Sequence, residues 1–217
     1  MDILAGLSDK LRFIERFYES ASNPFRETKR KIESGEEPFT SRPFDPETVT
    51  GEPEFLEEWI EADDSLNLVG QAALNLVQTS LREYLDAFIF RSPPPEGLEP
   101  TGKNWVERRK SLFLEAYAID WASGPVPISD LEEINLTRND IQHTETPFGA
   151  FGLTRRQSDE HRTRFPHGLF VHEIDRQLAT AAGDASMGRI YVTRENLKEA
   201  IQRVERFCEF LEEHRPY

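Results

Sequence analysis

The stretch that decides the fold is residues 131–146, LEEINLTRNDIQHTET. Leu131, Ile134 and Ile141 recur at the spacing of a single helix face, while the residues between them are polar or charged. This pattern predicts an amphipathic helix with its apolar side on the core. Its polar side carries the residues most able to do chemistry.

The ends of this helix have sequence signals of their own. Ser129 is followed three residues later by Glu132, and this capping box predicts the first turn. Pro147 and Gly149 are helix breakers and predict the end. We therefore expect His143 in the last turn, where the negative end of the helix dipole favours a protonated imidazole.

The polar side of the helix carries Arg138, Asn139 and His143. At about 100° per residue, Asn139 and His143 share a face, while Arg138 lies about 140° from His143. A long arginine side chain, or an arginine of a second copy, could still reach the imidazole. A guanidinium that holds a phosphate beside an imidazole that moves a proton can cleave RNA without a metal. The alternative is a surface arginine near a histidine that merely suits the helix dipole.

Arg138, Asn139 and His143 resemble the motif of the HEPN superfamily, whose ribonucleases carry arginine, a polar residue, three more residues and histidine. In that family the motif lies near a helix end, and the active site forms where two protomers meet. The resemblance implies a homodimeric, metal-independent and cofactor-free endoribonuclease. It implies His143 as general acid or base, Arg138 as the ligand of the scissile phosphate, and Asn139 as the residue that orients one of them.

The resemblance also implies a biological setting, a toxin of a toxin–antitoxin pair or a part of a phage-defence system. An antitoxin or another defence protein would then be a partner, and cleavage by the ribose 2′-OH would leave a 2′,3′-cyclic phosphate and a 5′-hydroxyl. The competing function is a catalytically inactive HEPN-like bundle that serves as an interaction or nucleotide-binding module.

Length and composition favour one domain spanning residues 1–217, because 217 residues of which 37% are hydrophobic suffice for one core but not comfortably for two. We expect N-terminal helices and a connector in residues 1–52, core helices with the motif in 53–146, and a basic loop, ribbon and last helix in 147–217. The predicted fold is mainly α, a HEPN-like helical bundle with long crossing helices and a small two-stranded β ribbon before the C-terminal helix.

The net charge of −14 argues against a general nucleic-acid coat, because phosphate contacts need local positive charge. A single cysteine, Cys208, is expected to be buried and excludes an internal disulfide framework, which fits a reducing cytoplasm. The sequence has no run of about 18 apolar residues, so no membrane span is expected. Its first residues do not read as a signal peptide.

A basic segment follows the motif and contains Arg155, Arg156, Arg162 and Arg164. We expect it to guide RNA phosphates into the site. One alternative is a polar loop that pairs with acidic residues elsewhere, and another is an arm that binds a partner protein. Nearby histidines lack the spacing of metal ligands, so no metal site is expected.

Helical periodicity and turn residues predict the remaining elements. The expected helices are residues 3–19, 25–33, 53–90, 104–124 and 193–214, with Pro24 separating the first two. Two short β-branched runs, residues 168–174 and 189–192, are expected to pair as the ribbon. The residues between them, 177–187, are expected to form a loop or one or two helical turns.

Overall fold

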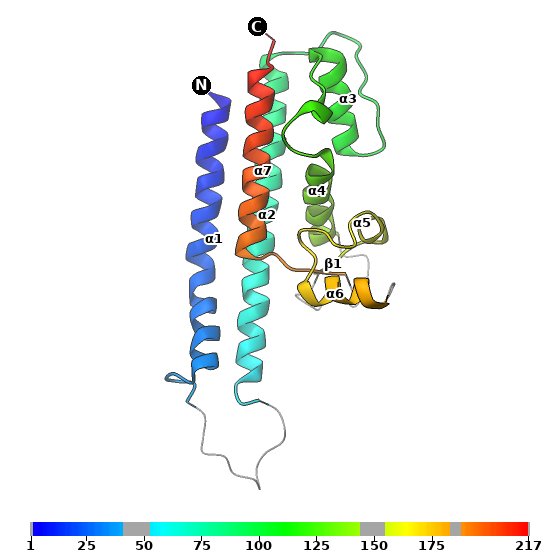
Figure 1. Cartoon of the computed structure of the whole chain (residues 1–217). Helices are drawn as coiled ribbons and strands as arrows, with labels where there is room; N and C mark the ends of the chain where they lie inside the picture. The colour runs from blue at the N-terminus through cyan, green and yellow to red at the C-terminus, as the bar shows by residue number, and fades with distance from the viewer. Residues whose placement is uncertain (1, 41–52, 144–154, 183–187, 217) are drawn as a thin grey trace.

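The computed structural model describes residues 2–40, 53–143, 155–182 and 188–216 (Figure 1). These residues are mainly helical and carry a two-stranded antiparallel sheet before the last helix, which confirms the predicted class. In chain order the elements are α1 (Ile3–Ser34), α2 (Leu56–Arg91), α3 (Trp105–Tyr117), the 3₁₀ turn η1 (Trp121–Ser123), α4 (Ile128–Gln142), β1 (Arg155–Arg156), α5 (Asp159–Arg164), α6 (Glu173–Ala182), β2 (Arg189–Ile190) and α7 (Arg194–Glu213).

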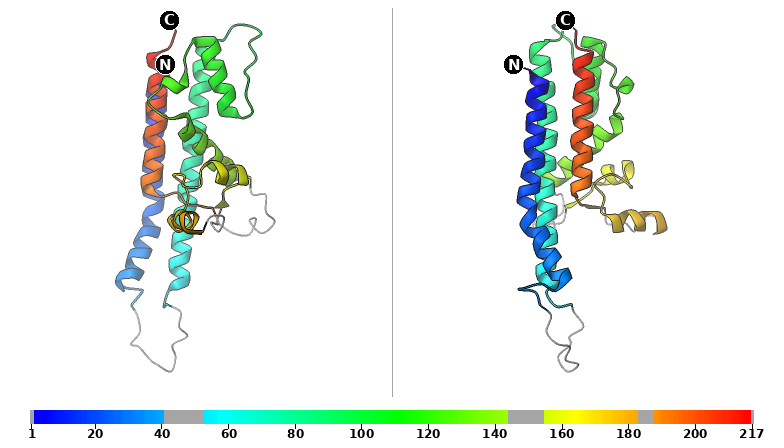
Figure 2. Two further views of the ribbon diagram at one scale, coloured as in Figure 1. Left: turned by 45° about the vertical axis from the view of Figure 1, so that its right-hand side comes forward. Right: turned by 60° about the vertical axis from the view of Figure 1, so that its left-hand side comes forward.

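Three long helices form the body of the molecule. Helices α1 and α2 run alongside each other, and α7 packs against both (Figures 1 and 2). Helix α4 contacts α2 and α7, while α3 and the small elements α5, α6 and the ribbon lie on the same side as α4. The motif helix therefore packs against the body on one side and meets the smaller elements on the other.

The core is built around aromatic rings that connect four elements. The ring centroids of Phe88 and Phe113 lie 5.0 Å apart, those of Phe113 and Trp121 5.4 Å, and those of Trp121 and Phe207 4.7 Å. Rings at these separations attract each other in addition to burying apolar area. Cys208 is buried beside Phe207, as predicted, and burial raises the pKa of its thiol well above the usual value.

Side chains cap α3 and α7, whereas the cap predicted for the motif helix does not form. The Asn104 side chain accepts from the Glu107 N–H at 2.9 Å, and Thr193 caps α7 by accepting from the Asn196 N–H at 3.2 Å. The capping box at Ser129 was wrong, because α4 begins at Ile128, after Pro127, with no side-chain cap. The carboxylate expected to close that box pairs with α5 instead.

Pro24 does not divide the first helix, contrary to the prediction. Helix α1 continues through Pro24, although a proline inside a helix costs a backbone hydrogen bond and about 3 kcal/mol. Contacts with α2 beyond the proline offset that cost: Lys29 pairs with Asp63 and lies over the Trp59 ring at 3.9 Å, and the indole N–H of Trp59 donates to Glu33.

The ribbon forms, but its first strand is not the predicted one. Strand β2 pairs with β1, with Arg155 opposite Ile190, and residues 168–174 contribute the single bridge between Val171 and Ile190. The His172 N–H donates to the Arg189 carbonyl at 2.9 Å and the Tyr191 N–H donates to the Phe170 carbonyl at 2.9 Å, but this pairing goes no further because residues 173–182 form α6. After β2 the Asn67 side chain of α2 takes over the pairing, since it donates to the Ile190 carbonyl at 3.1 Å and accepts from the Val192 N–H at 3.0 Å.

Replacing Gly70 by alanine tests the close packing of α2 against the segment after β2. A methyl group at Gly70 would lie 2.3 Å from the Val192 carbonyl oxygen, whereas one at Gly6 of α1 would meet nothing within 4 Å. We expect Gly70→Ala to lower the free energy of unfolding by about 1–3 kcal/mol. Gly6→Ala, the matched control, should leave it unchanged or raise it by up to about 1 kcal/mol. Urea denaturation measures both, and equal midpoints would contradict the packing described.

Candidate functional site

Asn139 connects the other two motif residues. Its side-chain oxygen accepts a hydrogen bond from the Arg138 guanidinium at 3.1 Å, and its backbone carbonyl accepts from the His143 N–H at 2.8 Å. Arg138 is half-buried, while His143 is exposed at the C-cap of α4. His143 was expected in the last turn, but α4 ends at Gln142 and His143 follows as its C-cap. Residues 144–149, including the breakers expected to end the helix, lie outside the described residues.

Sequence reasoning missed Arg82, which α2 places near Arg138. Burial, followed by the charge of Arg82, lowers the pKa of Arg138. The Arg82 guanidinium lies 5.1 Å from the ring centroid of Trp105, and the Nε of Arg138 is buried without a partner. Among the described residues no carboxylate pairs with either arginine. Because the proximity of Arg82 and Arg138 comes from packing of α2 against α4, no local signal in the sequence could have found it.

The packing between α2 and α4 is polar. The Gln78 amide donates to the Asn135 side-chain oxygen at 3.1 Å, and both residues are buried. Thr137 is buried too, so the side of α4 that the sequence presents as polar is largely covered. At the edge of this packing, Arg82, Asn135 and Asn139 also line a pocket.

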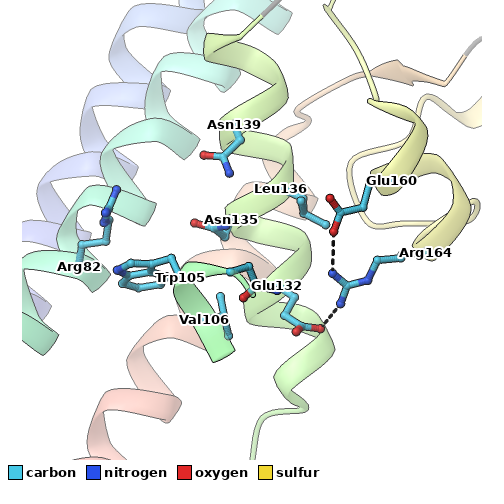
Figure 3. Close-up of a pocket in the computed structure, with 10 residues that line it drawn as sticks. Arg82, Trp105, Val106, Glu132, Asn135, Leu136, Asn139, Glu160 and Arg164 are labelled. Atoms are coloured by element: carbon cyan, nitrogen blue, oxygen red, sulfur yellow. Dashed lines mark hydrogen bonds and ion pairs between the residues drawn. The ribbon is translucent and has the colours of Figure 1, made fainter. Parts of the chain in front are cut away.

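A pocket of about 360 Å³ opens beside the motif helix (Figure 3). Helix α4 provides one wall, α2 and the start of α3 another, and α5 the remainder. The lining residues are Arg82, Asn104, Trp105, Val106, Glu132, Asn135, Leu136, Asn139, Glu160 and Arg164. Arg164 pairs with Glu132 and, at 3.4 Å, with Glu160.

A buried acid–histidine pair fastens α5 to the motif helix. Asp140 lies beside Asn139 in the chain, and its Oδ2 is 2.7 Å from Nδ1 of the buried His161. The same oxygen accepts from the Ser158 N–H at 3.0 Å. The position of α5, which carries two of the predicted RNA-binding arginines, therefore depends on a residue inside the span of the motif.

The basic segment is distributed over two elements and is partly neutralised. Arg155 and Arg156 form β1, and Arg162 pairs with Asp159 at 2.9 Å. Arg164 faces the pocket but is paired with acids there. The interpretation of the segment as an RNA guide stays a prediction. The ion pair of Arg164 with Glu132 fits the alternative, a polar loop that pairs with acidic residues elsewhere, whereas Arg162 pairs locally and both arginines lie in α5.

Comparison with known proteins yields no relative: no protein-family model, no curated protein and no solved structure matches this chain. Within the described residues, no three His, Cys, Asp or Glu side chains gather in a way that could hold a metal ion. Every helix in the same residues is too short or too polar to cross a lipid bilayer.

Asp140→Asn tests the anchoring of α5. The change removes the negative charge that receives His161 and the Ser158 N–H, and we expect it to lower the free energy of unfolding by about 1–3 kcal/mol. Asp159→Asn is the matched control, because the Asp159 side chain is 95% exposed whereas that of Asp140 is 9% exposed. The control should cost less than about 1 kcal/mol. Equal losses in thermal or urea unfolding would contradict the anchoring role.

Glu133 gives a pH-dependent test. Burial raises the pKa of the Glu133 carboxyl above its usual 4.5, against the opposing effect of a hydrogen bond from the Phe170 N–H. Below pH 4.5 the Glu133 carboxyl is protonated in both the folded and the unfolded state, and the free energy of unfolding is unaffected by its charge. As the pH rises through the folded-state pKa, the free energy of unfolding falls, because the unfolded chain loses this proton more readily. We therefore expect Glu133→Gln to stabilise the protein above pH 4.5, with the gain increasing with pH and then levelling off. Unfolding measured across the pH range checks this, and a gain independent of pH would contradict it.

Proposed function

We propose that this chain is a metal-independent endoribonuclease of the toxin or phage-defence type, acting as a homodimer. The observation that carries the proposal is the motif at the end of α4, where Asn139 bonds both Arg138 and His143, and where neither Arg138 nor the nearby Arg82 has a carboxylate partner in the described chain of this acidic protein. Neighbouring like charges repel unless an anion lies between them. A phosphodiester is such an anion, and guanidiniums recognise its oxygens well.

The proposed reaction uses the groups around these arginines. His143 accepts the proton of a ribose 2′-OH, and the 2′ oxygen attacks the adjacent phosphorus. A new bond joins the 2′ oxygen to phosphorus while the bond from phosphorus to the 5′ oxygen breaks, and the leaving oxygen takes a proton from water or from a second imidazole. Arg138 and Arg82 stabilise the charge that builds on the phosphate oxygens. The products are a 2′,3′-cyclic phosphate and a 5′-hydroxyl.

The placement of Arg138 and His143 on α4 sets what the RNA must span. They are separated by about 7–8 Å along the helix axis at 1.5 Å per residue and by about 140° around it, so a ribose and its 3′ phosphate would have to pass over Asn139 to reach both. Asn139 lies between them and holds the Arg138 guanidinium by its side chain. It is therefore the positioning residue of the proposed site.

One observation favours the competing function, an inactive HEPN-like module that binds nucleotides or a protein partner such as an antitoxin. No described residue forms a hydrogen bond with the His143 imidazole, and a catalytic histidine is usually oriented by such a bond. In a homodimer the second copy would supply that bond. Whether the protein cleaves RNA therefore distinguishes the two proposed functions.

Cleavage of RNA by substituted proteins tests the proposal. His143→Ala should lower the rate about 10²–10⁴-fold, because the general base is lost. Arg138→Ala should lower it about 10²–10³-fold, because charge on the phosphate is no longer stabilised. EDTA should have no effect, and the products should carry 5′-hydroxyl ends.

The matched control is His214→Ala, which removes a histidine at the C-cap of a different helix, α7. It should cleave like the unsubstituted chain. The proposal is contradicted if RNA remains intact, if His143→Ala and His214→Ala cleave equally, or if EDTA stops the reaction.

A further inference from the structure

The pocket beside the motif has two chemically different ends. Arg82 and Asn139 lie at one end, and the carboxylates of Glu132 and Glu160, joined by Arg164, lie at the other (Figure 3). A phosphate is attracted to the first end and repelled by the carboxylates at the second. Any nucleotide that enters must therefore place its phosphate toward Arg82 and its base toward α5.

Two amide groups face this pocket with unused donors. The Asn139 side-chain oxygen accepts from Arg138, and the Asn135 side-chain oxygen accepts from Gln78. In the described chain neither NH₂ group donates a hydrogen bond, although both residues line the cavity. Side-chain amides that point their NH₂ groups into a cavity suit a ligand with carbonyl or ring-nitrogen acceptors.

The remaining wall is apolar and aromatic. Trp105 lines the pocket with Val106 and Leu136, and the Arg82 guanidinium lies over the Trp105 ring. Single-stranded RNA is bound through bases that are splayed out and packed against aromatic and arginine side chains. Trp105, Arg82 and Arg164 are the side chains of this kind that line the pocket, and Arg164 is engaged by Glu132 and Glu160.

We infer that this pocket binds one nucleobase of the RNA, the base of the nucleotide whose phosphate Arg82 and Arg138 hold. The base packs against Trp105, its acceptors receive the amide of Asn135, and its N–H donors face the carboxylates, while Asn139 lies beside the phosphate. At 1.5 Å per residue, Asn135 lies about 6 Å along the helix axis from Asn139, which matches the reach from a phosphate to its base. The inference rests on the proposed function and adds base recognition to it.

Nucleotide binding to the full chain tests the inference without relying on cleavage. Tryptophan fluorescence is followed while each of the four ribonucleoside 3′-monophosphates is added, with ribose 5-phosphate as the probe that lacks a base. We expect the nucleotides to quench the emission and ribose 5-phosphate to leave it unchanged. In Trp105→Phe the quenching should be lost and the affinity, followed by calorimetry, should fall about tenfold, because base stacking on the indole is weakened.

Trp59→Phe is the matched control, since Trp59 lies on α2 beside Lys29 and Glu33 and does not line the pocket. It should bind nucleotides like the unsubstituted chain. Ribose 5-phosphate quenching as strongly as the nucleotides, or Trp105→Phe retaining both quenching and affinity, overturns the inference.

A second measurement covers the case in which Trp105→Phe does not fold. Sequencing the 5′-hydroxyl ends of cleaved RNA should show one base enriched at a fixed position next to the cut. Asn135→Asp keeps the oxygen that accepts from Gln78 but removes the NH₂ donors, so it should flatten that preference. Cuts that are random in sequence overturn base recognition while leaving the nuclease intact. Nucleotide binding without any cleavage contradicts the nuclease while supporting the pocket.

Discussion

The contact on which the site depends is the buried hydrogen bond between Gln78 of α2 and Asn135 of α4. A buried amide that loses its partner costs more than the bond contributes when made, so this pair permits few rotations of α4 against α2. With that rotation fixed, the side chains of Arg138 and Asn139 lie at the edge of the contact between α2 and α4, near Arg82. The bond therefore sets both the register of two helices and the position of the cationic pair.

Burial on several sides explains why the motif helix differs from an ordinary amphipathic helix. Leu131 and Ile134 face the core, as their spacing predicted, but Glu133, Thr137 and Asp140 are buried as well. Burying such groups is favourable only where partners meet them, and α2, α5 and the segment before α6 supply most of those partners. The small elements after the motif thus complete the environment of α4, which a bundle of long helices alone would leave exposed to water.

The sequence was sufficient for features governed by local rules and insufficient for those governed by packing. Apolar spacing and turn residues predicted α7 and the start of α3, because both depend on residues within one or two turns. The predicted end of α3 at residue 124 was wrong, because the helix ends at Tyr117 and Trp121–Ser123 form a separate 3₁₀ turn. The predicted start of α4 was wrong because Glu132, expected to close a capping box, pairs instead with Arg164, which lies far along the chain. The predicted break at Pro24 was wrong for the same reason, because contacts with α2 decide whether α1 continues. The candidate site divides likewise: Arg138, Asn139 and His143 were recognisable as a spacing, while Arg82 joins them only through the fold.

Asn67 and Gly70, one turn apart on α2, have a consequence for how the ribbon is aligned. Each strand is only two residues long, too short to determine its own alignment. The Asn67 side chain forms hydrogen bonds with the backbone of residues 190 and 192, and the Val192 carbonyl can pack closely against α2 because Gly70 has no Cβ. A slip by one residue would turn Ile190 out to solvent and break both amide bonds. Helix α2 therefore sets the register of the ribbon, and it also fixes the position at which α7 begins.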